Sequence, residues 1–300
     1  MLKRVQHDNE ADGKPMRKFI FIIIYTIILL LVGRSLIFLP KIGFITNPQK
    51  ETESLRNDIK KIISVAPGSY GIYYASLVDD NSFGINEKQI FTAGSVNKVP
   101  IIAVLYHLAS KDKINLDEVV TLKKEDIQDY GTGSLRYQKP GTTYSLKTLA
   151  KLSLQQSDNT AAYIIATRMD ADVVQKTIND WGLSQTDMIN NKTSPYDMYL
   201  LFKKIYKGEV TSEALTKELL DFLTDSDFED RIPVLLPKDV AIYHKTGDIV
   251  GGMHDVGIVE KNNKAFYLGV MTTDIGDKEN ETKQYIGVIA KKLFNFDQDN

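Results

Sequence analysis

The residues of this chain best suited to chemistry are a serine and a lysine three positions apart. Ser95 follows Gly94, and Lys98 precedes an apolar run from Val99 to Leu108. If this run is helical, the amine of Lys98 lies on the same face as the hydroxyl of Ser95. A serine hydroxyl becomes a good nucleophile when a neighbouring base accepts its proton. A single Ser-x-x-Lys is a frequent chance match, so the pair needs support from the rest of the chain.

The composition excludes several other kinds of chemistry. The chain has 300 residues, a formal net charge of −2 and no cysteine. Without cysteine there can be no disulfide, thiolate metal site or cysteine nucleophile. The four histidines are scattered along the sequence, so no metal site is expected, and nothing indicates a cofactor. A net charge near zero provides no basic field for nucleic acid. We expect a monomer with one or two domains.

The N-terminal forty residues have the pattern of a membrane anchor. Residues 1–18 contain several lysines and arginines, and residues 19–39 are almost entirely apolar. About 20 apolar residues are enough to span a bilayer, and basic residues before a span predict a cytoplasmic N-terminus. We therefore expect a single-pass protein of the cell membrane, with a linker at 40–50 and the remaining chain outside the cytoplasm. The alternative is a cleaved signal peptide, but no clear small-residue cleavage site is present.

Strand and helix patterns at both ends surround a mostly helical middle. Apolar spacing predicts helices at 51–65, 146–154, 160–169, 196–206 and 283–294, and strands at 70–78, 83–90, 240–245, 256–259 and 266–271. A glycine-containing loop at 130–134 is expected to line a cleft. This order predicts an α+β fold, with an antiparallel sheet flanked by terminal helices and an inserted all-α part. The expected catalytic domain is 51–298, with its sheet part at 51–94 and 232–298 and its helical part at 95–231.

Two further triplets strengthen the opening pair. Ser157-Asp158-Asn159 lies between two helical patterns, and Lys245-Thr246-Gly247 ends a predicted strand. Each triplet is a weak signal alone, but this order and spacing resemble the class A β-lactamases and penicillin-binding proteins. The segments 149–161 and 255–259 also resemble that family. The chain from about 51 to 298 is therefore similar to a class A β-lactamase-like serine hydrolase, here with a membrane anchor.

The resemblance implies a catalytic role for four residues. Ser95 would attack the carbonyl of a β-lactam or of a D-Ala-D-Ala peptide, and Lys98 would accept its proton. A lysine must be neutral to act as a base, and burial beside Lys245 would lower the pKa of Lys98. Ser157 would relay a proton to the leaving nitrogen. Lys245 would hold the substrate carboxylate by its charge.

The same resemblance implies five residues that bind substrate. Asn159 would hold the side-chain carbonyl, and Thr246 would bind the carboxylate with its hydroxyl. Gly247 would let the substrate approach the strand edge without meeting a Cβ atom. The backbone N–H of Asp248 would join that of Ser95 in an oxyanion hole. Arg231 would support carboxylate binding, with an ordinary surface salt bridge as the alternative. Asp158 is expected to be structural.

One part of the family pattern is absent. Class A β-lactamases release the acyl group with a loop glutamate, yet the interval from Asn159 to Thr193 contains no glutamate. Asp187 is its only late carboxylate, and we expect a turn or capping residue there. The prediction is acylation of Ser95 with slow hydrolysis of β-lactams. The alternatives are a D,D-peptidase acting on cell-wall peptides, a β-lactam-binding sensor without turnover, or a structural domain with inert motifs.

Overall fold

The structure is a computed structural model, and it describes residues 23–27 and 48–299. Contacts divide the chain into two compact units, Met1–Asn47 and Pro48–Asn300. Residues 23–27 are helical. The rest of the expected cytoplasmic segment, membrane span and linker up to residue 47 lies outside the described residues. Within the described ranges, no helix is both long and apolar enough to cross a bilayer.

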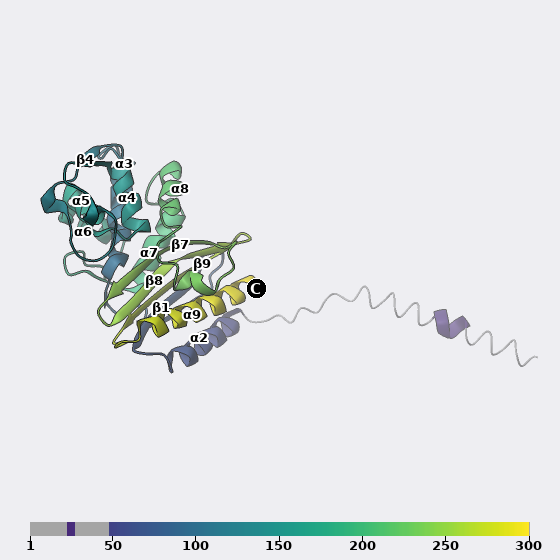
Figure 1. The fold of residues 1–300 in the computed structure, drawn as a ribbon. Coiled ribbons are helices and arrows are strands. Elements are labelled where there is room, and N and C mark those ends of the chain that lie inside the picture. Colours follow the sequence, from purple (N-terminus) through teal and green to yellow (C-terminus); the bar gives the residue numbers. More distant parts are fainter. Residues whose placement is uncertain (1–22, 28–47, 300) are drawn as a thin grey trace, which may run out of the picture. The chain divides into compact units, whose positions relative to one another are not determined.

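The second unit is built on a five-stranded sheet (Figure 1). Its strand order is β2-β1-β9-β8-β7, and every neighbouring pair is antiparallel. The strands are β1 (Ser69–Ser76), β2 (Ser82–Ile85), β7 (Ala241–Ile249), β8 (Gly252–Lys261) and β9 (Lys264–Thr273). Both ends of the unit therefore contribute to one sheet, which confirms the predicted α+β class. β7 forms one edge of the sheet, and this edge packs against the turn that contains Ser95.

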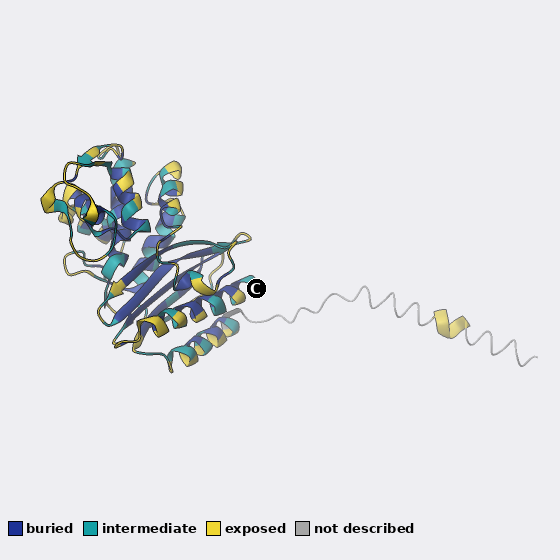
Figure 2. Ribbon diagram, viewed as in Figure 1, coloured by how far each residue is buried: buried dark blue, intermediate teal, exposed yellow. Residues whose placement is uncertain are grey.

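Two terminal helices lie side by side against one face of the sheet (Figure 1). These are α2 (Pro48–Ile63) and α9 (Glu279–Asp299), the latter longer than the predicted 283–294. Apolar residues of both helices and of the sheet form a shared core. Figure 2 shows the strands largely buried and the outer faces of these helices exposed. The opposite face is covered by α7 (Pro195–Tyr206), which packs on β9, β1 and β8. The sheet is thus buried on both sides.

The helical part is organised around α3 (Lys98–Ala109). This helix is apolar almost all round and buried along most of its length, as expected for a helix in the centre of a core. Pro100 is tolerated because it lies in the first turn, where its missing N–H needs no partner. Around α3 lie α4 (Leu146–Gln155), α5 (Asn159–Met169), α6 (Ala171–Asp180) and α8 (Glu213–Asp221).

Short elements complete the fold. They are β3 (Phe91–Thr92), β4 (Val119–Thr121), β5 (Thr143–Ser145) and β6 (Lys192–Thr193), and the 3₁₀ turns η1 (Gly94–Asn97), η2 (Lys124–Asp126), η3 (Leu135–Tyr137) and η4 (Ile232–Leu235). β3 pairs with β6, and β4 pairs with β5. The β3–β6 pair is the one that matters for function, because it joins the chain just before Ser95 to the segment before α7.

The β8–β9 hairpin is tighter than the sequence pattern indicated. Lys261 pairs directly with Lys264, so the turn contains only two residues. Both of these, Asn262 and Asn263, have positive φ angles of 54° and 61°. Two-residue hairpin turns of this kind favour asparagine because it tolerates the left-handed conformation.

We predict that Ile102→Ala destabilises the protein by about 2–5 kcal/mol, because Ile102 is fully buried in α3 and its truncation leaves a cavity. The control is Val288→Ala on the exposed side of α9, with an expected change within about 0.5 kcal/mol. Urea unfolding followed by circular dichroism measures both. Equal midpoints for the two variants would contradict the central position of α3.

Candidate active site

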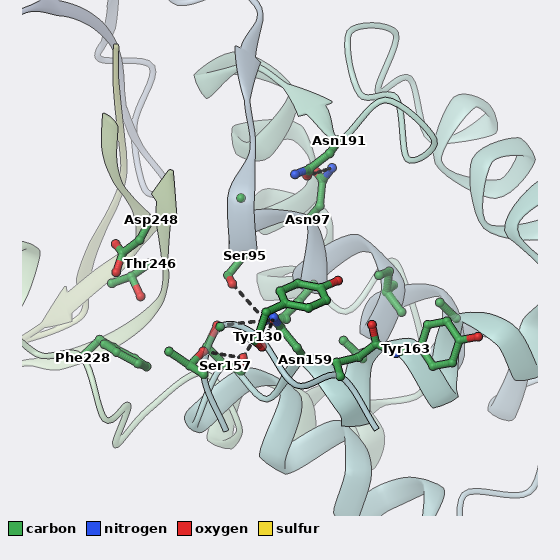
Figure 3. A pocket seen from close by; sticks show the side chains of 18 of the residues that line it. Ser95, Asn97, Tyr130, Ser157, Asn159, Tyr163, Asn191, Phe228, Thr246 and Asp248 are labelled. Atoms are coloured by element: carbon green, nitrogen blue, oxygen red, sulfur yellow. Dashed lines mark hydrogen bonds between the residues drawn. The ribbon is translucent and has the colours of Figure 1, made fainter. Parts of the chain in front are cut away.

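A pocket of about 580 Å³ lies between the edge strand β7, the η1 turn and the start of α5 (Figure 3). All three sequence motifs contribute to its walls. Of the nine predicted site residues, the lining includes Ser95, Lys98, Ser157, Asn159, Thr246 and Asp248. The remaining three, Arg231, Lys245 and Gly247, lie behind this surface. The fold therefore brings together segments that are more than 150 residues apart in the chain, such as those of Ser95 and Asp248.

Ser95 lies in a 3₁₀ turn rather than in the helix itself. The turn η1 ends where α3 begins at Lys98, and Gly94 enters it with a φ of +56°. A Cβ on Gly94 would come within 3.1 Å of the Asp248 carbonyl oxygen and 3.4 Å of its nitrogen. Only glycine combines this backbone conformation with so close an approach. The turn thus holds partly exposed Ser95 against the backbone of β7.

The side chain of Lys98 connects three parts of the site. Its Nζ lies 2.9 Å from Ser95 Oγ and 3.1 Å from Ser157 Oγ. It also donates to the Ser157 carbonyl at 2.6 Å and to Asn159 Oδ1 at 2.7 Å. This confirms that Lys98 and Ser95 lie within direct proton-transfer distance.

The pKa of Lys98 is low because the side chain is buried. Burial lowers it to about 8, against an opposing effect of the Asp158 carboxylate. From the sequence, the charge of Lys245 was expected to contribute to the low pKa of Lys98 as well. Instead, burial is the cause for Lys98, and the repulsion between the two lysines adds to the lowering of the Lys245 pKa. About a tenth of Lys98 is therefore neutral at pH 7, far more than for a lysine with an unshifted pKa.

Ser157 has a strained backbone that lets it contact Lys98. Its φ is +52°, in the left-handed region that non-glycine residues rarely adopt. In this conformation both its carbonyl and its hydroxyl reach Lys98. Asp158 holds the turn, because its carboxylate accepts hydrogen bonds from the backbone N–H of Ala161 and Leu135. The expectation that Asp158 is structural agrees with these contacts.

The loop at 130–134 covers Asn159, as expected for a cleft loop. Asn159 Nδ2 donates to the Tyr130 carbonyl at 3.1 Å. A Cβ on Gly131 would meet Asn159 Nδ2 at 2.2 Å, so only glycine allows the loop to lie this close. Tyr130, Gly131 and Thr132 all line the pocket. The loop fixes the Asn159 amide with its Oδ1 towards Lys98.

Gly247 allows close packing between β7 and the η1 turn. A Cβ there would lie 2.7 Å from the Ala93 carbonyl oxygen and 3.3 Å from Val96 nitrogen. Gly247 also lies outside the pocket lining. The missing side chain therefore lets β7 pack against η1. The clear path for substrate that the resemblance implies at Gly247 stays a prediction. Thr246 and Asp248, on either side of it, do face the pocket.

Lys245 lies behind the pocket wall. Its side chain is fully buried, with Nζ 3.1 Å from the Thr246 carbonyl and 5.9 Å from the Phe228 ring centre. Burial, followed by the charge of Lys98, lowers its pKa to about 7. Direct contact with a substrate carboxylate, as predicted, would require Lys245 to reach past Thr246 or Phe228.

Arg231 is paired inside the protein. It is fully buried, and its guanidinium donates to the Asp248 carboxylate and to the His254 carbonyl at 2.7 Å. Its Nε also lies 3.3 Å from Asp230 Oδ1. This arrangement is neither a surface salt bridge nor a free carboxylate-binding group, the two alternatives considered from sequence.

An asparagine pair that was not predicted from the sequence also lines the pocket. Asn97 Nδ2 donates to Asn191 Oδ1 at 3.0 Å, and both residues line the pocket. Asn97 lies between Ser95 and Lys98 in the motif itself, which was its available signal. Asn191 has a φ of +50° and accepts from Ala93 N–H through its carbonyl. Asn191 thereby links the segment before α7 to the strand that leads into the η1 turn.

Asp187 belongs to the short turn that precedes Asn191. Its backbone forms an isolated antiparallel β-bridge with that of Lys192. Its carboxylate accepts hydrogen bonds from the side chain and the backbone N–H of Asn190 at 2.8 and 2.9 Å. The side-chain bond, followed by the backbone bond, lowers the pKa of Asp187. Asp187 is absent from the pocket lining, so its expected role as a turn residue agrees with the structure. Across the described ranges, no group of three or more acidic or histidine side chains could hold a metal.

Comparison with known proteins places this site in a family. The model of the β-lactamase enzyme family matches residues 54–296. Beta-lactamase BRO-1 of Moraxella catarrhalis is 20% identical over 285 residues, covering 86% of this chain and 89% of that protein. The solved structure of PBP-A aligns with a TM-score of 0.77 at 28% identity, covering 82% of this chain and 97% of PBP-A. A mutant of PBP-A has been solved as its acyl-enzyme complex with penicillin G.

The fold is shared more widely. A β-lactamase from Chitinophaga pinensis aligns with a TM-score of 0.77 at 23% identity, covering 81% of this chain and 99% of that one. Together with the antiparallel sheet and the helices that flank it, this similarity confirms a β-lactamase/transpeptidase-like fold. The match to the family model spans most of the described chain, and the protein therefore belongs to the β-lactamase enzyme family as a serine hydrolase of the β-lactamase type.

Proposed function

We propose that this protein forms an acyl-enzyme with β-lactams through Ser95 and hydrolyses it slowly. The observation that carries the proposal is the 2.9 Å contact between Ser95 Oγ and the buried amine of Lys98. Neutral Lys98 takes the hydroxyl proton as Oγ bonds to the lactam carbonyl carbon. The lactam C–N bond then breaks as Ser157 gives its hydroxyl proton to the nitrogen. Ser157 takes the proton held by Lys98, whose Nζ lies 3.1 Å from its Oγ, and Lys98 returns to the neutral form. The backbone N–H groups of Ser95 and Asp248 stabilise the oxyanion.

The reason for proposing slow hydrolysis of the Ser95 ester lies in the positions of the carboxylates around the pocket. Among the described residues that line it, Asp248 is the only one with a carboxylate, and Arg231 pairs with that group. Asp187 is engaged by Asn190. Neither group is positioned as a free base for an attacking water. Acylation therefore outpaces hydrolysis of the ester.

A D,D-peptidase acting on wall peptides is the second candidate. The similarity to PBP-A, of which a mutant forms an acyl-enzyme with penicillin G, supports it together with the missing loop glutamate. Residues 19–39 are proposed as a membrane anchor that places residues 41–300 outside the cytoplasm, on the strength of the sequence pattern alone.

Incubation of the full-length, detergent-solubilised protein with a fluorescent penicillin should give a long-lived adduct on Ser95, located by peptide mass spectrometry. Ser95→Ala should abolish the adduct. Ser110→Ala, at the exposed C-terminal end of α3, should leave it unchanged. Release of D-alanine from a D-Ala-D-Ala peptide would favour the peptidase. Many turnovers per second of a cephalosporin would contradict slow release, and absence of any adduct would contradict the proposal.

The first-order acylation rate at saturating penicillin should rise with pH and level off above about 8, the pKa to which burial lowers Lys98. The reason is that only the neutral amine accepts a proton, and its fraction grows about tenfold per pH unit below the pKa. Lys98→Ala should lower the plateau by about 10²- to 10⁴-fold. Lys151→Ala, on the exposed side of α4, is the control. A flat profile between pH 6 and 10 would rule out Lys98 as the base.

A further inference from the structure

The pocket continues beyond Ser95 on the side away from β7. Figure 3 shows Tyr163 and Thr246 on opposite sides of Ser95. Among the described residues that line the pocket, only Lys98 and Asp248 carry a charged side chain. The part beyond Ser95, here called the apolar extension, is lined by Ile101, Ala162, Tyr163, Ala166 and Met188.

Helix periodicity joins the apolar extension to the catalytic residues. Ala162, Tyr163 and Ala166 follow Asn159 on α5 at spacings that share one helix face. Ile101 follows Lys98 by one turn of α3. The two helices pack together, and Lys98 Nζ donates to Asn159 Oδ1 at 2.7 Å. The same two helices that hold the reacting groups therefore also form the floor of the extension.

The apolar extension is formed in advance and remains accessible. Tyr163 is 43% exposed, whereas Ile101, Ala166 and Met188 are half-buried. Ile101 and Met188 also pack against the main hydrophobic core. The backbone N–H of Met188 donates to Gln175 Oε1 at 2.8 Å, which ties its turn to α6. A preformed apolar surface of this kind gains stability when a ligand covers it.

The position of Asn159 indicates which part of an acyl donor reaches the extension. One of the two Nδ2 hydrogens is donated to the Tyr130 carbonyl, so the other can donate to a substrate carbonyl. The expected partner is the carbonyl of the acyl side chain. A group attached beyond that carbonyl then lies over Ala162 and Ala166, on the following turns of the same helix face. The occupant is thus the end of the acyl side chain.

We infer that the apolar extension is a subsite for an apolar acyl side chain, so that donors ending in an aromatic or branched alkyl group acylate Ser95 faster than donors with a short or charged side chain. Covering apolar surface favours the complex, and the Tyr163 ring can pack on an aromatic ring of the donor. A charged end would lose its hydration without gaining a partner. This inference rests on the proposed acylation of Ser95.

The test compares benzylpenicillin, whose side chain is phenylacetyl, with the penicillin that carries acetyl in its place. The measured quantity is the ratio of their second-order rate constants for Ser95 acylation in the full-length protein. In the wild type the phenylacetyl compound should be faster by about tenfold or more. Ala166→Leu should lower this ratio about tenfold, because leucine occupies space in the extension. Ala214→Leu, at an exposed position of α8, should leave the ratio unchanged.

A second measurement needs no variant and covers the case in which Ala166→Leu fails to fold. In the wild-type protein, penicillins with straight-chain acyl groups from acetyl to heptanoyl should react faster with each added CH₂, until the extension is filled. A flat series, or an Ala166→Leu ratio within about twofold of wild type in folded protein, would overturn the inference. Ser95 would still be acylated in those cases, so the proposed function would stand. No Ser95 adduct with any of these penicillins would overturn both.

Discussion

The site depends on a single buried amine. Lys98 Nζ contacts the η1 turn through Ser95. It contacts the segment between α4 and α5 through Ser157, and the first residue of α5 through Asn159. A buried amine without partners is costly, so these segments must stay in register for the fold to be stable. The strained backbone of Ser157 is tolerated because the Asp158 carboxylate holds the neighbouring turn from inside the protein. Packing and chemistry thus depend on the same hydrogen bonds.

The second requirement is that the edge strand β7 lies directly on the η1 turn. Gly247 makes this possible, because any side chain there would enter the backbone of Ala93. His254 secures the same junction from β8. Its ring accepts from Thr272 N–H at 3.1 Å and, through the other nitrogen, donates to the Thr92 carbonyl at 2.8 Å. Burial lowers the pKa of His254 to about 4, so the ring is neutral and can fill both roles at once.

Local signals were sufficient for much of this architecture. Apolar periodicity located the main helices and strands, and the three ordered motifs identified the six residues that meet in the pocket. What the sequence could not reveal depends on side-chain packing between distant segments. His254 bonds to the carbonyl of Thr92, 162 positions away. The pairing of Arg231 with Asp248 and the covered position of Lys245 depend likewise on how β7 and β8 pack. No spacing rule encodes such contacts.

The contacts that favour acylation also limit what can follow it. Lys98 is surrounded by Ser95, Ser157 and Asn159, which point its amine at the serine oxygen rather than into open solvent. A water that attacks the ester must approach from another direction and needs its own base. The carboxylates that could supply one are already bound, Asp248 by Arg231 and Asp187 by Asn190. Within the described part of the chain, Asp248 and Asp187 are therefore engaged in structural contacts. This is the physical basis for proposing that the Ser95 ester forms faster than it is hydrolysed.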